Sequence, residues 1–526
     1  MRSRRIVAFV FTLVMLLLGQ QAISHAASKD TLVFSWTSNV GPLNPHLYSP
    51  SQMFAQDMVY EPLVRYGDDG TILPCLAERW SISPDGRTYT FFLRKGVVFS
   101  DGAPFDANVV KKNFDAVLAN AERHTWLELI NQIADTAAPD AYTFTLMLKH
   151  AYYPTLQELC LIRPLRFLSP AAFPESGNTA EGIKKPVGTG PWILVETRKG
   201  EHDIFERNER YWERKPAMKR IVVKVIPDPD TRAVALQTGE IDLIYGVGQI
   251  SLESFARLRK QGRFGTVISQ PLATRAMAIN SGRGATADLA VRKAILHSVN
   301  RAAIIKNIFM DIELPAETFF SPDTPYCNLG LAPYAHDVAL AGKILDEAGW
   351  KRVPGNDFRS KDGKALSLDL CFVGNDALQK SLAEAIQGDL RKAGIRAVLI
   401  GEEPDSFYNR QRSGQFGMIF GDTFGAPYDP HSMVSSMRAP SHADYQAQVG
   451  LPMKSDLDKQ INQVLLTVDG NKRQAIYRDI LTTLHEQAVY LPLSYMTGAI
   501  VHDPDLTEVN YGPTKNEIPF TDMRWR

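Results

Sequence analysis

The sequence predicts an α/β protein of two lobes joined by strand crossovers, with a ligand cleft between the lobes. Its 526 residues are 44 % hydrophobic, which is enough for a large buried core in two or three domains. Residues 221–245 and 367–401 each read as strand, helix and strand, the pattern of βαβ units. Residues 269–280 and 489–494 are the predicted crossovers between the two lobes.

The N-terminus has the pattern of a secretory signal peptide. The basic segment MRSRR precedes a thirteen-residue stretch, Ile6–Leu18, in which Thr12 is the one polar residue, and Ser24-His25-Ala26 is a small-x-small cleavage site. The apolar run is too short to span a bilayer. We therefore expect residues 1–26 to be removed. The remaining chain, with 55 basic and 58 acidic residues, is then near −3 and exported without a membrane anchor.

The cysteines refine this expectation. The first, Cys75, is far from the signal peptide, so no cysteine is available for N-terminal lipid attachment. A soluble, untethered binder is retained only by an outer membrane, so we expect a bacterial periplasm. Cys75, Cys160, Cys327 and Cys371 show no CxxC spacing. The export route permits disulfides, but we interpret all four as small core residues.

Local patterns predict the elements of the first lobe in order. An alternating strand starts at Thr31, and a helix follows Ser51, its expected N-cap. Pro84–Arg87 is a hairpin turn before a strand at 89–93. Asp106 opens an amphipathic helix, and a strand follows the tight turn at Gly188 and Gly190.

The second lobe has a clearer α/β rhythm. A strand at 367–373 precedes a helix that Asn375 caps and Gly394 ends, and residues 396–401 form the next strand. This unit predicts a mostly parallel sheet. A helix at 471–487 then leads into the return crossover. The expected organisation is lobe I at 27–270 plus 495–526, with a subdomain inserted at about 68–210, and lobe II at 271–494.

The stretch Phe424–His442 is the strongest candidate for a ligand site. Its nineteen residues include Phe424, Tyr428, His431 and His442, and they are punctuated by three prolines and a glycine. These prolines and the glycine predict an ordered loop, with a short helix after Pro430. Loops that carry aromatic, histidine and arginine side chains commonly hold ligands.

No motif supports an enzyme. The segment His485-Glu486-Gln-Ala-Val has valine where a zinc metalloprotease needs its second histidine. Gly282-Arg-Gly284 lacks the third glycine of a dinucleotide fingerprint, and there is neither a nucleophile elbow nor a phosphate-binding loop. The balanced charge, 58 basic against 58 acidic residues, also gives no indication of nucleic-acid binding.

Motifs along the chain resemble a known family. The pattern W-x-x-S-x-DG-x-x-x-x-F-x-L-R-x-G-V-x-FSDG-x-PF-x-A spans 80–107, and further matches lie at 188–192, 208–212, 226–232, 239–243, 291–295 and 347–350. Together they resemble the extracellular solute-binding proteins of the peptide and nickel ABC importers. This resemblance implies a bilobed periplasmic-binding-protein fold of type II, in its large three-domain subclass. It also implies an inner-membrane permease with its ATPase as partners, and a monomer.

The densest matches, GPLNPHLY, RHTWLELINQIAD, AYYPTLQELC and GAPYDPH with SSMRAPSHADYQAQ, resemble the nickel-binding branch of that family. In that branch the cleft takes nickel as a chelate with small organic ligands, such as a metallophore or a histidine-type complex. The resemblance implies that His442 coordinates the metal. It implies that Arg123 and Arg163 hold the carboxylates of the chelate, as guanidinium groups do. The implied walls of the site are Tyr48, Met53, Trp126, Phe424 and Tyr428.

The sequence departs from that branch at two places. Tryptophan stands in the relatives where this chain has Phe424, and a basic pair stands where it has Gly421-Asp422. Phenylalanine loses the indole donor, and the acid lowers the positive potential at the cleft. We therefore expect a slightly larger site that prefers a less anionic chelate.

Two interpretations from other functional classes stay open. One is an exported chaperone or structural protein, for which the sequence offers no specific support. Tyr428-Asp429-Pro430 also fits an oligopeptide- or dipeptide-binding protein of an ABC importer, because peptide binders of the family hold the ligand's α-amine with an acid near that position. His431 and His46 compete with His442 as metal ligands, although we interpret both as structural. Residues 511–520 near the C-terminus receive no role.

Overall fold

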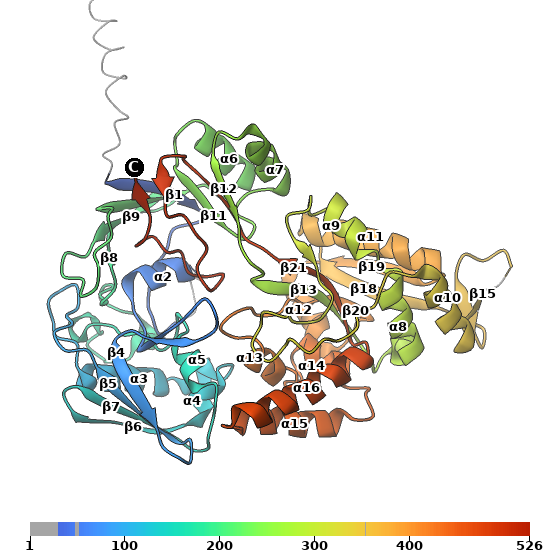
Figure 1. Ribbon diagram of the computed structural model, residues 1–526, viewed down its shortest axis with the longest axis horizontal. Helices are drawn as coiled ribbons and strands as arrows, with labels where there is room; N and C mark the ends of the chain where they lie inside the picture. The colour runs from blue at the N-terminus through green and yellow to red at the C-terminus, as the bar shows by residue number, and fades with distance from the viewer. Residues whose placement is uncertain (1–29, 48–51, 353) are drawn as a thin grey trace, which may run out of the picture.

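The computed structural model describes residues 30–47, 52–352 and 354–526. The predicted signal peptide, Ser51 and the candidate ligand residue Tyr48 lie outside the described residues. Two main β-sheets organise the rest, and helices flank both of them (Figure 1).

The first sheet has seven strands in the order β12-β22-β11-β1-β10-β9-β8. Strands β10 and β11 both run parallel to β1, one on each side of it, and α6 connects them. This is the predicted βαβ unit at 221–245. The strands of the first sheet and the two helices between them in the sequence are β1 (Thr31–Trp36), β8 (Trp192–Arg198), β9 (His202–Arg207), β10 (Arg220–Val225), α6 (Pro229–Gln237), β11 (Leu243–Gly246), α7 (Leu252–Gln261), β12 (Gly265–Ile268) and β22 (Ala499–His502).

A four-stranded antiparallel sheet, in the order β4-β5-β7-β6, lies between β1 and β8 in the sequence. The predicted turn at 84–87 connects β4 and β5, and the Asp106 carboxylate caps α3 by accepting from Val109 N at 3.0 Å. The elements of this part are α2 (Met53–Val59), β2 (Val64–Tyr66), β3 (Ile72–Pro74), β4 (Ala77–Ile82), β5 (Thr88–Leu93), α3 (Ala107–Leu118), η1 (Ala121–His124), α4 (Glu128–Gln132), β6 (Ile133–Asp140), β7 (Thr143–Leu148) and α5 (Thr155–Leu159). We call this part, residues 52–160, the inserted part.

The second sheet has six strands in the order β14-β21-β13-β20-β18-β19. Strands β18 and β19 are parallel and joined by α11, as predicted, but Asp376 rather than Asn375 caps that helix. Gly394 ends it in the left-handed conformation, at φ 86°. The strands are β13 (Ala273–Ile279), β14 (Leu314–Pro315), β18 (Ser367–Val373), β19 (Arg396–Glu402), β20 (Met418–Phe420) and β21 (Tyr490–Met496), and α11 is Ala377–Ala393.

The prediction of a mostly parallel second sheet is wrong. Strand β13 pairs antiparallel with β20 and with β21, and β14 pairs antiparallel with β21. The reason lies in the crossovers, because the chain enters this sheet along β13 and leaves it along β21. Two such strands side by side run in opposite directions.

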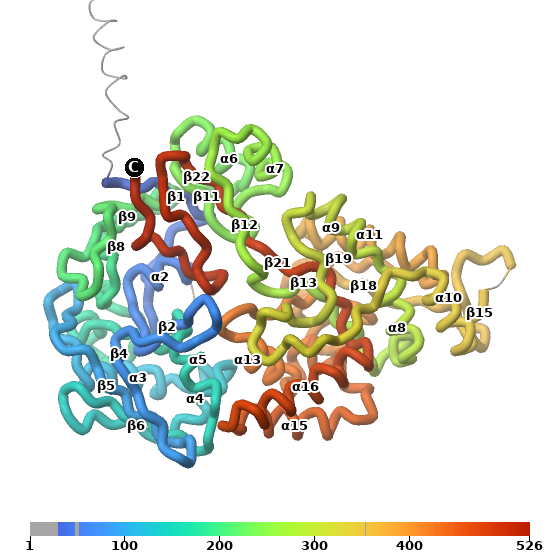
Figure 2. Tube along the Cα trace, viewed as in Figure 1, coloured from blue at the N-terminus to red at the C-terminus, as the bar shows by residue number. Residues whose placement is uncertain are grey.

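The two crossovers lie next to each other (Figure 2). Ser269 N donates to Gly498 O at 3.0 Å, and Gly498 N donates to Ser269 Oγ at 2.8 Å. These reciprocal hydrogen bonds tie the two connections between the sheets together. Any rotation of one sheet against the other therefore has to occur at this short double connection.

Helices cover the second sheet, and two of them meet the inserted part. Tyr153 N donates to Leu465 O at 3.1 Å, the hydroxyls of Tyr153 and Tyr477 are 2.5 Å apart, and the Arg473 guanidinium lies 4.1 Å from the centre of the Tyr153 ring. The two halves are thus in contact far from the crossovers. The helices are α8 (Leu289–Ser298), α9 (Arg301–Asn307), α10 (Val338–Glu347), α12 (Pro404–Ser413), α13 (His431–Ser436), α14 (Ala443–Gln448), α15 (Lys454–Leu466) and α16 (Gly470–Glu486).

The four cysteines are buried and form no disulfide, as their interpretation as core residues predicted. Within the described ranges, no helix is both long and apolar enough to cross a membrane.

Candidate functional site

Aromatic side chains from both halves of the molecule meet between them. The Trp126 and Tyr428 rings are 6.3 Å apart between centroids, and Phe424 meets Tyr428 edge-on at 6.5 Å. Trp126 lies between η1 and α4 in the inserted part, whereas Phe424 and Tyr428 lie in the loop between β20 and α13. The structure thus brings together three predicted wall residues, and Trp126 is some 300 positions away from the other two in the sequence.

Arg163 lies beside this aromatic cluster. It is half-buried in the turn after α5. Burial raises the pKa of the Tyr428 hydroxyl to about 12, and the positive charge of Arg163 opposes this shift. A guanidinium next to an aromatic wall suits a carboxylate-bearing ligand, which it can hold by paired, charge-assisted hydrogen bonds.

The neighbouring Arg166 has a different task. Its buried guanidinium donates to the carbonyls of Leu161, Cys160 and Tyr60 and to Asp57 Oδ1, at 2.7–3.2 Å. These bonds fold the turn that carries Arg163 and attach it to α2. Arg166 is therefore structural, and Arg163 is the arginine of the pair that faces the cluster.

Arg123 lies in η1, three residues before Trp126, and its side chain is exposed. Burial lowers the pKa of the adjacent His124 to about 4, and the charge of Arg123 adds to this shift. Arg123 is thus on the same short segment as Trp126. A ligand that contacts Trp126 would lie within reach of this second cation.

Asp429 holds the loop that carries Phe424 and Tyr428. Its buried carboxylate accepts from Gly425 N at 2.8 Å and from Phe424 N at 3.2 Å. Burial raises the pKa of Asp429, whereas these amides and the Thr423 hydroxyl lower it by stabilising the charged form. The peptide bonds before Pro427 and Pro430 are cis.

The same loop is attached to strand β13. Thr274 N donates to Thr423 Oγ1 at 2.9 Å, and Thr423 N donates to Thr274 O at 2.8 Å. Gly425 has φ 78°, and a Cβ at this position would lie 2.3 Å from Leu272 O. Only glycine fits so close to the crossover strand.

His442 and Met53 lie at the starts of two helices. His442 precedes α14 and is half-buried, and its imidazole makes no hydrogen bond to the residues that the structure describes. Burial raises the pKa of Asp444, two residues further on, and the neighbouring His442 opposes this shift. Met53 is the first residue of α2 and is half-buried. The two ring contacts of the aromatic cluster involve neither His442 nor Met53.

The competing histidines differ from each other. His46 Nδ1 lies 2.9 Å from Thr179 Oγ1 and its Nε2 lies 3.2 Å from Arg166 O, while burial lowers its pKa to about 4. These contacts support the interpretation of His46 as a structural residue. His431 is equally buried, but its Nε2 has no hydrogen-bond partner in the described structure.

Asp422, at the second departure from the nickel-binding branch, is paired. Its carboxylate lies 3.8 Å from the guanidinium of Arg275, which also contacts Glu313 at 3.2 Å. Arg275 is buried at 8 % exposure, so two acids neutralise one buried cation. The charge of Asp422 is therefore shared with Arg275 and does not stand alone at the cleft.

A cavity of about 670 Å³ lies between the two halves, on the other side of the loop that Asp429 holds. Its volume is in the range of small-molecule sites. Sequence reasoning missed most of its walls, because they are turns and crossovers without a motif of their own. Besides Thr423, Gly425, Ala426 and Asp429, these walls come from Tyr66, Asp68–Gly70, 269–274, Ser321, Asp323–Pro325 and Tyr511–Pro513. The C-terminal segment thus contributes to the cleft.

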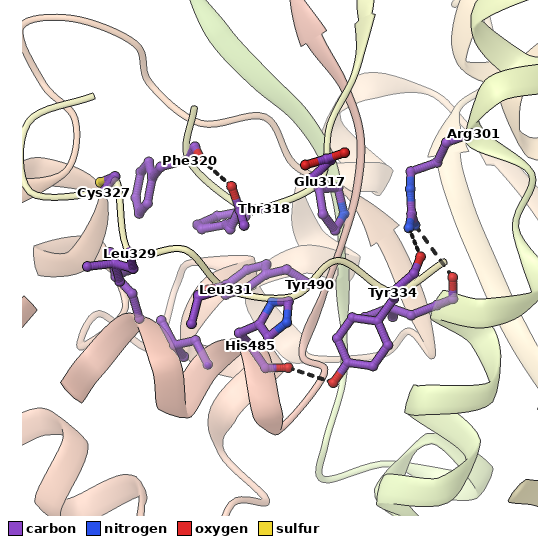
Figure 3. Close-up of a pocket in the computed structure, with 15 residues that line it drawn as sticks. Arg301, Glu317, Thr318, Phe320, Cys327, Leu329, Leu331, Tyr334, His485 and Tyr490 are labelled. Carbon is purple, nitrogen blue, oxygen red and sulfur yellow. Dashed lines mark hydrogen bonds between the residues drawn. The ribbon is translucent and has the colours of Figure 1, made fainter. Parts of the chain in front are cut away.

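A second cavity, drawn in Figure 3, lies within the half that contains the second sheet. Leucine and aromatic side chains line it, and the Tyr334 hydroxyl donates to His485 O at 3.0 Å beside it. Its volume of about 30 Å³ has room for one or two water molecules only. None of the predicted site residues lines it.

The donor set of the site suits a chelate better than a bare ion. Among the described residues, no group of three or more histidine, cysteine, aspartate or glutamate side chains is arranged to hold a metal ion. One imidazole, two guanidinium groups and a set of aromatic rings would leave a transition metal short of ligands. A metal bound here has to bring its other donors with it.

Comparison with known proteins identifies the family. The sequence model of the bacterial extracellular solute-binding proteins, family 5 (middle region), matches residues 71–445. The chain is 52 % identical over 514 residues to the nickel-binding periplasmic protein of Escherichia coli (strain K12), covering 98 % of both chains. The protein therefore belongs to the family 5 extracellular solute-binding proteins, which bind substrates for ABC importers.

Two solved structures share the fold. NikA from Brucella suis, in complex with Fe(III)-EDTA, is similar with a TM-score of 0.92 and 55 % identity over 94 % of this chain and 100 % of that one. NikZ from Campylobacter jejuni, in complex with Ni(L-His), is similar with a TM-score of 0.76 and 25 % identity over 94 % of this chain and 99 % of that one. These matches confirm the predicted bilobed fold class.

Removing the carboxylate of Asp429 should loosen the loop that carries Phe424 and Tyr428. In Asp429→Ala, the amides of Phe424 and Gly425 and the Thr423 hydroxyl lose their acceptor. Leaving one such buried group without a partner costs about 1–3 kcal/mol. Hydrogen exchange at the Phe424 and Gly425 amides should accelerate by about 10- to 100-fold. The exposed Asp405→Ala serves as the control. Unchanged protection of both amides in Asp429→Ala would contradict the assigned role.

Proposed function

We propose that this protein is the periplasmic binding component of an ABC importer and that it captures nickel as an organic chelate. The observation that carries the proposal is the contact of Trp126 with Tyr428 across the interface, with Arg163 beside it. Aromatic walls exclude water, and a guanidinium holds a carboxylate. This combination suits a compact, carboxylate-bearing metal complex.

Each predicted residue has one part in this proposal. Trp126, Phe424 and Tyr428 cover the chelate, and Met53 extends the wall from the start of α2. The family resemblance assigns Tyr48 to the same wall. Arg123 and Arg163 hold its carboxylates. His442 coordinates the nickel, because its imidazole is half-buried and makes no hydrogen bond to a described residue, and because imidazole is a good nickel ligand.

The relatives of the protein support nickel as the metal. The Escherichia coli relative is a nickel-binding protein, and the two structural relatives hold iron(III) and nickel complexes of organic ligands. In each complex the metal arrives with its own donors. The site described above has the same requirement, which is the reason for proposing a chelate.

The alternative of a peptide-binding protein loses its main support. It relied on Asp429 to bind the α-amine of a peptide. The Asp429 carboxylate instead accepts hydrogen bonds from Phe424 N and Gly425 N within its own loop. The cations Arg123 and Arg163 favour a ligand that carries an anionic group, whereas a peptide binder needs an acidic side chain for the ligand's α-amine.

Delivery follows from the two-lobed architecture. The reciprocal hydrogen bonds between Ser269 and Gly498 mark the place where the halves can rotate. The lobes accept the chelate when open and close over it by hinge motion. The closed form is presented to the permease and its ATPase by a monomer without a membrane anchor, and we assign the protein no catalytic role.

Isothermal titration calorimetry tests the ligand class directly. The nickel–L-histidine complex should bind with a Kd in the micromolar range or below, that is, about −8 kcal/mol or better. Free nickel and metal-free mixtures of di- to pentapeptides should bind far more weakly. Tight binding of peptides without metal would overturn the proposal in favour of the peptide-binding alternative.

Two variants separate the metal contact from the carboxylate contact. His442→Ala should weaken nickel–L-histidine binding but leave nickel–EDTA binding almost unchanged, because EDTA can fill the nickel coordination sphere by itself. Arg163→Ala should weaken both by about 10- to 100-fold through the loss of a charge-assisted bond, without changing which metal is preferred.

The controls for these variants are the exposed residues His336 and Arg87, each replaced by alanine. Calorimetry with both complexes is again the measurement. If His442→Ala and His336→Ala bound nickel–L-histidine equally well, His442 would not be a metal ligand.

A further inference from the structure

Glu158 is a buried carboxyl group that the proposed function does not use. It lies on α5 in the inserted part and is 2 % exposed. Its Oε1 accepts from the Tyr152 hydroxyl at 2.6 Å, and its Oε2 accepts from Leu129 N at 2.8 Å. Leu129 is three residues after Trp126, so this carboxyl anchors the segment that carries Trp126.

The same carboxyl faces the other half of the molecule. Its Oε1 lies 3.6 Å from Nε2 of His431, and both side chains are almost completely buried. That distance is too long for a hydrogen bond, and His431 Nε2 has no other partner in the described structure. His431 is three residues after Tyr428, in the first turn of α13.

Glu158 therefore connects three segments of the candidate site. It bonds to the segment of Trp126, it precedes Arg163 by five residues, and it opposes the helix that follows Tyr428. The three segments come from different parts of the chain and meet at this one group. A shift of Glu158 would move all of them.

The surroundings of Glu158 contain no compensating cation in contact with it. Within the described ranges, the one basic side chain recorded within 4 Å of its carboxyl group is that of His431, at 3.6 Å. Glu128 and the hydroxyls of Tyr152 and Tyr153 are close on its own side, and Tyr428 and His431 face it from the other half. The guanidinium of Arg473 covers the Tyr153 ring at 4.1 Å, and that of Arg163 acts on Tyr428.

Burial without a cation keeps both groups neutral. It raises the pKa of Glu158 to about 8, with a further contribution from Glu128, while the bonds from Tyr152 and Leu129 lower it. Burial lowers the pKa of His431 to about 3. Separation of the lobes would expose the facing sides of both groups to water. Their pKa values would then return toward the ordinary values of 4.5 and 6.5.

We propose that Glu158 is a positioning residue that fixes the Trp126 and Arg163 segments against Tyr428 and takes up a proton when the lobes close. The inference rests on the proposed function in one respect, that a ligand closes the lobes. The proton comes from solvent, and it leaves again when the lobes open. Closure over the ligand is thereby linked to pH through a group that does not touch the ligand.

The sign of the effect follows from the two groups. In the closed form, Glu158 is protonated up to about pH 8. At any pH between the pKa of Glu158 in the open form and its pKa in the closed form, closure therefore takes up a proton, and the affinity for the ligand falls as the pH rises. His431 is charged in the open form below about pH 6.5, so there closure releases a proton. The two effects oppose each other below pH 6.5. Between pH 6.5 and 8 the effect of Glu158 remains.

Calorimetry in two buffers of different ionisation enthalpy measures this proton. At pH 7.5, binding of the preformed nickel–L-histidine complex should take up about half a proton or more in the wild type. Its affinity should fall by up to about tenfold from pH 6.5 to 8. Glu158→Gln, which imitates the neutral carboxyl, should show almost no uptake and a flat affinity over this range. The exposed Glu175→Gln should behave like the wild type.

A second pair of variants tests the positioning role. Glu158→Gln keeps an acceptor for Leu129 N and should retain wild-type affinity at pH 6.5, whereas Glu158→Ala should lose at least about tenfold. Tyr152→Phe removes a bond that stabilises the carboxylate, so it should move the alkaline fall in affinity to higher pH.

The outcomes are distinct. Absence of proton uptake in the wild type, or the same uptake in Glu158→Gln as in the wild type, would overturn the inference while leaving chelate binding intact. Equal affinities of the Gln and Ala variants would overturn the positioning role. Failure of the wild type to bind any nickel complex would instead overturn the proposed function.

Discussion

The carboxylate of Asp429 fixes the geometry on which the candidate site depends. It accepts from the amides of Phe424 and Gly425 and thereby closes the loop that presents Phe424 and Tyr428 to the other half of the molecule. The loop is attached in turn to β13, the strand by which the chain enters the second sheet. A buried acid that satisfies amides of its own loop is costly to remove, so it is well suited to hold aromatic side chains in place. The same bonds make it unavailable as a ligand group, and this distinguishes the site from one built to bind a peptide amine.

The two halves of the site have different physical characters. The inserted part and the turn that follows it supply two cations and an exposed indole, Arg123, Arg163 and Trp126. The loop after β20 supplies two further aromatic rings. Neither half alone encloses a ligand. Contacts far from the crossovers, such as those of Tyr153 with Leu465 and Tyr477, hold the halves together in the arrangement described. Glu158 and His431 lie between these contacts and the aromatic cluster, which explains how a pair of groups remote from the ligand can affect the closure that encloses it.

Local signals in the sequence predicted local structure well. The βαβ units at 221–245 and 367–401, the Asp106 cap and the Gly394 stop all depend on residues within one or two turns of each other. The direction of β21 was not predictable in this way, because it depends on how the chain returns from the second sheet. The same holds for the site. The family resemblance supplied Trp126, Arg163, Phe424 and Tyr428. Asp429 bonds to amides of its own loop, whereas Glu158 functions through Leu129 and His431, which only the fold brings near. The cavity walls at Tyr66–Gly70 and Tyr511–Pro513 carry no motif and follow from the crossovers alone.

In the proposed function, the metal of a chelate lies beside the contact of Trp126 with Tyr428 and is coordinated by His442. A crystal structure of the protein loaded with nickel–L-histidine, with anomalous data collected at the nickel edge, tests it most directly. We expect a single strong nickel peak within coordination distance of the His442 imidazole, with the ligand carboxylates at Arg163 and the aromatic rings around it. A nickel peak at His431, or one outside the interface between the two lobes, would contradict it.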